Sequence, residues 1–147
     1  MSVLKNFMKA DRRCRRIFLS NMVMKGISGF MKFRKRRSKG KMFPAFQFIS
    51  VTNDCNLRCQ GCWVETGNPK VYMETEKIDS LVDAGKRQGS YFFGLLGGEP
   101  LMHKELNYIF EKHRDCYFQL FTNGTLFTRQ VAERLKKAGN VTPLISL

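Results

Sequence analysis

Four short apolar runs alternate with amphipathic stretches between residues 46 and 147, and this alternation strongly constrains the fold. The runs predict strands at residues 46–51, 91–96, 117–122 and 142–147. The run at 91–96 is apolar on both faces, which is typical of strands buried in a parallel sheet. Strands that alternate with helices form parallel sheets with right-handed crossovers. The sequence therefore predicts an α/β fold of the parallel (β/α) type.

Three stretches between these runs have the apolar spacing of helices. We expect the first helix to begin with Thr75 as its N-cap and to end at Gly89. The third should begin with Thr128 as its N-cap and end at Gly139. The predicted apolar faces consist of Ile78, Leu81 and Val82 in the first helix, Leu106, Ile109, Phe110 and His113 in the second, and Val131, Leu135 and Ala138 in the third.

Cys55, Cys59 and Cys62 follow the first predicted strand at C-x3-C-x2-C spacing. Grouped thiolates select soft metals, namely zinc, Cu(I) or iron–sulfur clusters. A structural zinc site needs four closed ligands, and the sequence has no second pair of cysteines or histidines at the required spacing. Three cysteines on a four-iron cluster leave one iron without a protein ligand. The spacing thus favours a cluster with one open iron, and a zinc-binding module remains an alternative.

Two further polar stretches follow the second and third predicted strands: Gly97-Gly98-Glu99-Pro100 and then Asn123. In a parallel β/α barrel the carboxyl ends of the strands meet at one rim, so these stretches should lie beside the cysteines. Glycines without a Cβ allow backbone to approach a ligand closely, and the Glu99 carboxylate suits an ammonium group. Asn123 either contacts the ligand or forms the turn.

Taken in order, the cysteine loop, Gly97 to Pro100 and the Thr122-Asn123-Gly124 turn resemble the radical S-adenosylmethionine (radical SAM) superfamily. The resemblance covers residues 46–147. It implies that the three cysteines hold a [4Fe–4S] cluster, whose fourth iron binds the amine and carboxylate of S-adenosylmethionine. It also implies that the Gly97 to Pro100 turn binds the methionyl amino group.

The superfamily usually has an aromatic residue just before the third cysteine, where this chain has Gly61. We expect Trp63 to cover the same space, over the adenine of S-adenosylmethionine. Ser146, near the end of the fourth strand, either faces the same rim or is an ordinary strand residue.

The resemblance implies a radical SAM enzyme or its N-terminal fragment, which reductively cleaves S-adenosylmethionine to a 5′-deoxyadenosyl radical for hydrogen abstraction. An electron donor of the flavodoxin or ferredoxin type and an unknown substrate, a peptide or a small molecule, are the implied partners. The alternative is a catalytically incompetent metal-binding fragment or pseudoenzyme. Residues 43–147 are expected to form the N-terminal portion of a partial TIM-type barrel that is truncated after its fourth strand.

Residues 1–42 form a separate basic arm in this interpretation. They hold 14 Lys or Arg and one acid, Asp11, whereas residues 43–147 carry a net charge of only +1. Ile17, Phe18, Met22 and Ile27 partly fit helical spacing. We expect either a solvated helix that packs its apolar side on the barrel or a helix that lies on an anionic membrane surface. Binding of nucleic acid through phosphates is less favoured.

The chain has five cysteines, an odd number of which three are grouped, and this fits a metal site in a reducing cytosol. We therefore expect a cytoplasmic protein, peripheral to a membrane if the arm binds lipid, with no membrane-spanning helix. Cys116 begins the third strand, roughly 16 Å from the rim, and is predicted to be a buried hydrophobe. Cys14 is predicted to be an ordinary residue. His103, near the Gly97 to Pro100 turn, is a candidate for contacting the residues of the site rather than the ligand itself.

Overall fold

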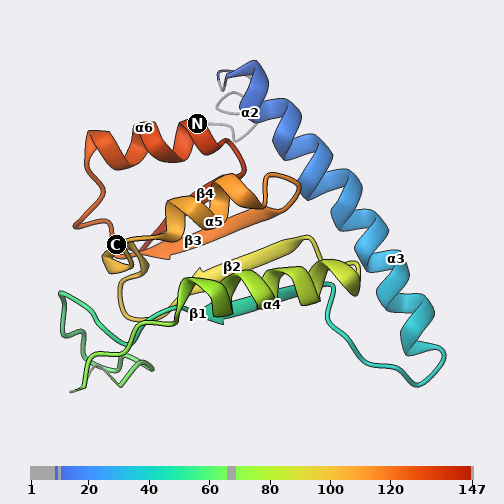
Figure 1. Ribbon diagram of the computed structural model, residues 1–147, viewed down its shortest axis with the longest axis horizontal. Coiled ribbons are helices and arrows are strands. Elements are labelled where there is room, and N and C mark those ends of the chain that lie inside the picture. Colours follow the sequence, from blue (N-terminus) through green and yellow to red (C-terminus); the bar gives the residue numbers. More distant parts are fainter. Residues whose placement is uncertain (1–8, 10, 66–68, 147) are drawn as a thin grey trace.

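The computed structural model describes residues 9, 11–65 and 69–146 and contains one parallel sheet (Figure 1). Its strands run in the order β1-β2-β3-β4, each paired in parallel with the next. The strands are β1 Phe46–Ser50, β2 Phe92–Leu96, β3 Tyr117–Thr122 and β4 Val141–Ile145. The prediction of a parallel α/β fold is confirmed. Leu147, placed by the sequence in the fourth strand, lies outside the described residues.

Three helices connect the strands, and a short 3-10 helix follows β2. These elements are α4 Thr75–Arg87, η2 Pro100–Met102, α5 Leu106–Lys112 and α6 Arg129–Ala138. The N-cap of α6 is Thr128, whose hydroxyl accepts a hydrogen bond from the Val131 N–H, and Gly139 ends the helix with a φ of +78°. Both boundaries of this helix agree with the sequence prediction.

The predicted start of α4 is wrong by one residue. Glu74 occupies the N-cap position and Thr75 is the first helical residue. The Thr75 hydroxyl donates a hydrogen bond to the Glu105 carboxylate instead of capping its own helix. The hydroxyl therefore joins the start of α4 to the start of α5, an arrangement that a local capping pattern cannot reveal.

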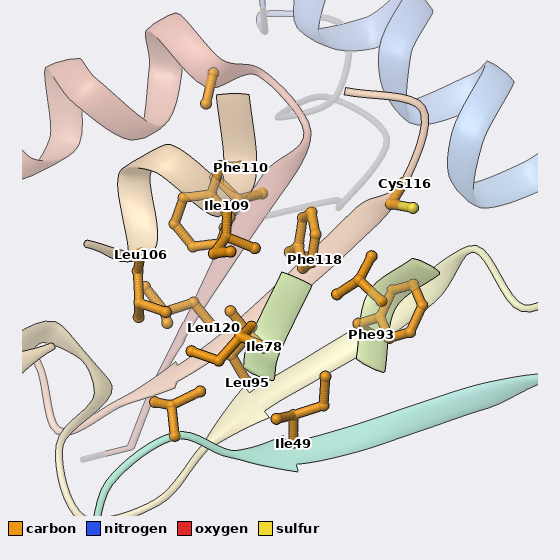
Figure 2. Close-up of a cluster of buried hydrophobic side chains, with 14 of the residues drawn as sticks. Ile49, Ile78, Phe93, Leu95, Leu106, Ile109, Phe110, Cys116, Phe118 and Leu120 are labelled. Atoms are coloured by element: carbon orange, nitrogen blue, oxygen red, sulfur yellow. The ribbon is translucent and has the colours of Figure 1, made fainter. Parts of the chain in front are cut away.

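The hydrophobic core lies between one face of the sheet and the helices (Figure 2). Phe93 and Phe118 stack with ring centroids 5.9 Å apart, and Phe110 of α5 meets Phe118 at 5.2 Å. The other face of the sheet is much less covered, because Phe46 and Phe48 of β1 are both about half exposed. One face of the sheet is thus fully packed, and the other is open next to the site described below.

The basic arm forms one continuous helix that begins at Arg12 and ends at Arg37. It consists of α2 Arg12–Ile17, the π-helix η1 Phe18–Met24 and α3 Lys25–Arg37, which follow one another without a break. Figure 1 shows this helix along the side of the molecule where the strands begin. It packs on the sheet there through Phe18, Asn21 and Lys25. The expectation that its apolar side packs on the sheet is wrong for Met22 and Ile27, which are exposed. Residues 1–8 and 10 of the arm lie outside the described residues. None of the described helices is both long enough and apolar enough to cross a bilayer.

Candidate functional site

The carboxyl ends of the strands border a cavity of about 450 Å³. Eight of the ten residues that the sequence assigns to the site line it: Cys55, Cys59, Cys62, Trp63, Gly97, Gly98, Asn123 and Ser146. The cysteine loop follows β1, the two glycines follow β2, and Asn123 and Ser146 follow β3 and β4. The topology therefore brings together residues that are up to 91 positions apart in the chain.

The loop that carries the cysteines is closed at its base. Thr52 and Tyr72 form an isolated antiparallel bridge, and the Thr52 hydroxyl donates to the carbonyl of Val71 at 2.8 Å. The Val71 N–H in turn donates to the Asn53 side chain at 2.6 Å. These hydrogen bonds fix the two ends of the loop to each other. We call these ends, residues 52–54 and 70–72, the neck of the loop; the cysteines lie between them in the sequence.

A buried carboxylate strengthens this neck. Asp54 accepts a hydrogen bond from the Tyr72 hydroxyl and pairs with the Lys70 ammonium at 3.1 Å. The hydrogen bond from Tyr72, followed by the interaction with Lys70, lowers the pKa of Asp54 below its usual value. Asp54 therefore stays ionised, and its two partners hold the residue that immediately precedes Cys55.

The three thiols border the cavity without converging on one point. Cys55 is half-buried, whereas Cys59 and Cys62 are exposed. Within residues 9, 11–65 and 69–146, no three His, Cys, Asp or Glu side chains are arranged to hold a metal ion. The donors nevertheless fit an iron–sulfur cluster, since such clusters are bound by Cys thiolates from one loop, with the ligands distributed over the irons.

Gly97 and Gly98 pack against the backbone of the loop neck. A Cβ on Gly98 would lie 2.1 Å from the Asp54 carbonyl oxygen, and one on Gly97 would lie 2.3 Å from that of Thr52. Gly97 also has a φ of +144°, which residues with a Cβ rarely adopt. The sequence predicted that these glycines permit close approach of a ligand. The structure shows close approach to the chain's own backbone, on residues that also line the cavity.

Glu99 lies beneath the cavity and is fully buried. One carboxylate oxygen accepts from the Leu101 N–H at 2.9 Å and from the Thr122 hydroxyl at 2.8 Å, and the other accepts from the Asn123 N–H at 2.8 Å. Pro100 is also buried and begins η2. These are the two predicted site residues that the structure does not bring to the cavity wall. Glu99 instead joins the turn after β2 to the end of β3.

Asn123 links the turn after β3 to the cysteine loop. Its side-chain amide donates to the Asn56 side chain at 2.9 Å and lies 3.8 Å from the Cys55 sulfur. Its side-chain oxygen Oδ1 accepts from the Thr125 N–H at 2.9 Å, which forms the turn. Sequence reasoning missed Asn56 and Thr125, whose side chains are 2.7 Å apart, because neither belongs to a periodic pattern or a ligand spacing.

Cys116 immediately precedes β3, beside the arm (Figure 2), and is not among the residues that line the cavity. It is fully buried, and burial together with the nearby Asp115 carboxylate raises the pKa of its thiol to about 12. Its predicted role as a buried hydrophobe is confirmed. Cys14 lies near the end of α6, and the His103 ring contacts the Met73 carbonyl at 2.8 Å, outside the cavity lining.

We expect Cys116 to resist alkylation in the folded chain. The thiolate is the reactive form, and a pKa near 12 leaves about one thiol in 10⁴ ionised at pH 8. Iodoacetamide followed by peptide mass spectrometry of the metal-free protein should label the exposed Cys59 and Cys62 but label Cys116 only after unfolding. Rapid labelling of Cys116 at the rate of Cys59 would contradict its placement in the core.

Comparison with known proteins places this site in a family. The model of the radical SAM superfamily matches residues 49–147. The chain is 38% identical over 99 residues to GTP 3′,8-cyclase of Syntrophomonas wolfei subsp. wolfei, covering 62% of the chain and 30% of the relative. It is 32% identical over 94 residues to Fe-coproporphyrin III synthase of Methanosarcina barkeri, covering 61% and 24%. The chain spans about 30% or less of the length of these curated relatives.

Solved structures show the same fold. SuiB of Streptococcus suis bound to its precursor peptide SuiA matches with a TM-score of 0.66 at 21% identity, over 80% of this chain and 28% of SuiB. BtrN in complex with AdoMet and 2-DOIA matches with a TM-score of 0.60 at 19% identity, over 71% of this chain and 46% of BtrN. Since the family model covers well over half of its residues, the chain belongs to the radical SAM superfamily, whose enzymes use a [4Fe–4S] cluster and S-adenosylmethionine.

Proposed function

We propose that this chain binds a [4Fe–4S] cluster through Cys55, Cys59 and Cys62 and carries the S-adenosylmethionine site of a radical SAM enzyme. The observation that supports this most is the gathering of all three cysteines with Gly97 and Gly98 around one cavity. When bound, the cluster and S-adenosylmethionine supply a reductive cleavage that generates a 5′-deoxyadenosyl radical for hydrogen abstraction. Residues 43–147 provide the N-terminal portion of the core domain, and residues 1–42 form a distinct arm.

In this proposal, different parts of the cavity wall bind the cluster and the different groups of S-adenosylmethionine. The anchored loop neck presents the thiolates, and the exposed Trp63 ring offers a surface on which an adenine can stack. Gly97, Gly98 and Ser146 provide backbone and hydroxyl groups for the polar end of S-adenosylmethionine. Glu99 positions the turn after β2 from below, through its hydrogen bonds to β3.

The substrate is a peptide or a small molecule, and the electron comes from a donor of the flavodoxin or ferredoxin type. The structural neighbours have different partners in their crystals, a precursor peptide for SuiB and 2-DOIA for BtrN. The half-exposed Phe48 of β1 and the Phe121 ring, 5.8 Å apart, extend the cavity wall onto the open face of the sheet. Substrate would therefore approach across an apolar surface.

Anaerobic reconstitution with iron and sulfide tests the proposal. The reconstituted chain should be brown and should give the electron paramagnetic resonance signal of a reduced four-iron cluster, which changes when S-adenosylmethionine is added. Dithionite should then yield 5′-deoxyadenosine, measured by chromatography. A cluster without deoxyadenosine would indicate an incompetent fragment or pseudoenzyme, and uptake of zinc in place of iron would indicate a zinc-binding module.

A further inference from the structure

The inner face of the arm helix (Arg12–Arg37) is held against the start of the sheet. Asn21 donates to the carbonyls of Arg114 and Cys116 at 2.7 and 3.1 Å, and the Lys25 ammonium donates to that of Asp115 at 2.6 Å. The inward positions share helical spacing and are Phe18, Asn21, Lys25, Gly29 and Arg36. This face is therefore occupied, and it fixes which side of the helix points away from the sheet.

The outer face of the arm helix carries large apolar side chains that are exposed. We call them the apolar stripe, and they are Leu19, Val23, Met24, Ile27, Phe30 and Met31. Met24 is 70% exposed, Met31 65%, Ile27 58% and Phe30 54%. Single exposed hydrophobes are ordinary on protein surfaces, but a contiguous stripe marks a site of interaction.

Basic side chains flank the apolar stripe at both ends. Arg12, Arg13 and Arg16 are exposed before it, and Arg34 and Lys35 are exposed after it. The helix from Arg12 to Arg37 contains ten Lys or Arg and no Asp or Glu. Whatever covers this face must therefore accept apolar side chains in the middle and positive charge on either side.

An anionic bilayer meets both requirements. Basic amphipathic helices lie in the membrane interface with their apolar side chains among the acyl chains and their basic side chains near the lipid headgroups. A nucleic acid would neutralise the arginines but would leave the aliphatic stripe in water, because binding to phosphates is electrostatic. A protein groove would have to be apolar along its length and strongly acidic at both ends.

The position of the arm fits this partner. The arm helix lies where the strands begin, and the cavity with the cysteines lies where they end (Figure 1). We propose that the apolar stripe and its flanking arginines dock the chain on an anionic lipid bilayer, with the arm helix parallel to the surface. The cavity would then face away from the lipid and stay accessible. This inference is independent of the proposed catalytic function.

Co-sedimentation of the full 147-residue chain with vesicles tests the docking. The chain should sediment with vesicles of phosphatidylglycerol and phosphatidylcholine, should not sediment with phosphatidylcholine alone, and should be released by high salt. The double variant Ile27→Gln/Phe30→Gln keeps the charge and should bind at least about tenfold more weakly, from the loss of apolar burial. Arg16→Gln/Arg34→Gln should weaken binding roughly 30-fold, at about 1 kcal/mol per charge.

Matched controls separate docking from damage to the fold. Met42→Gln alters a side chain that is 76% exposed but lies outside the arm helix, and Arg16→Lys/Arg34→Lys preserves the charge, so both should bind like the wild type. All variants should keep the wild-type circular dichroism spectrum. Equal binding to neutral vesicles would overturn the proposal, as would RNA binding without vesicle binding. A dimer lost in Ile27→Gln/Phe30→Gln, again without vesicle binding, would show instead that the stripe joins two copies.

Discussion

Replacement of Cys55, Cys59 or Cys62 with Ala, one at a time, should abolish the brown colour and the four-iron resonance signal of the reconstituted chain. Each thiolate ligates an iron of the proposed cluster, so each substitution leaves only two protein ligands. The expected effect is a near-complete loss of bound iron and sulfide, measured by colorimetric assay after desalting.

Cys14→Ala and Cys116→Ala are the matched controls for these three variants. Cys14 lies beside the carbonyl of Lys136, and Cys116 is fully buried just before β3, so neither borders the cavity. Both variants should retain the wild-type iron content and spectrum. Loss of the cluster in Cys116→Ala together with its retention in Cys59→Ala would refute the assignment of the ligands.

Glu99→Ala should lower the free energy of unfolding by about 3 kcal/mol, because it leaves the half-buried Leu101 and Asn123 N–H groups and the buried Thr122 hydroxyl without their acceptor. This is a large fraction of the 5–15 kcal/mol by which most domains are stable. Urea denaturation followed by circular dichroism measures the loss.

Two comparison variants make this result specific. Glu99→Gln keeps the shape of the side chain but turns one acceptor into a donor, so it should destabilise by less than Glu99→Ala. Glu111→Ala removes an exposed carboxylate on α5 and should change the free energy of unfolding by less than about 0.5 kcal/mol. Equal stability of Glu99→Ala and Glu111→Ala would mean that the joint between β2 and β3 does not depend on the carboxylate.

The strands and the position of the site could be predicted because both depend on local pattern and general topology. The bounds of β3 agree with the sequence at both ends, since an apolar run bounded by a polar segment and an Asn-Gly turn leaves little choice. The convergence of Cys55, Gly98 and Asn123 followed from their places after parallel strands.

The burial of Glu99 could not be predicted, because its partners Thr122 and Asn123 are 23 and 24 residues away and one contributes only a backbone N–H. The hydrogen bonds that hold the arm on the sheet could not be predicted either. Asn21 and Lys25 donate to backbone carbonyls, which every residue has, so no side-chain pattern marks these acceptors. Sequence patterns thus locate elements, whereas polar contacts to backbone appear only in the folded chain.

The hydrogen bonds from Asn21 to the carbonyls of Arg114 and Cys116 limit when the arm can pack during synthesis of the chain. These acceptors are 93 and 95 positions later in the chain, so the ribosome must add them long after the arm has emerged. At about 5–20 residues per second the wait lasts roughly 5–20 s. During this interval β1 and β2 are already made, but the acceptors of Asn21 are not, so the arm cannot yet form these hydrogen bonds. Of the described helices the arm is thus the first to leave the ribosome, yet its hydrogen bonds through Asn21 can form only once residues 114–116, just before β3, have been added.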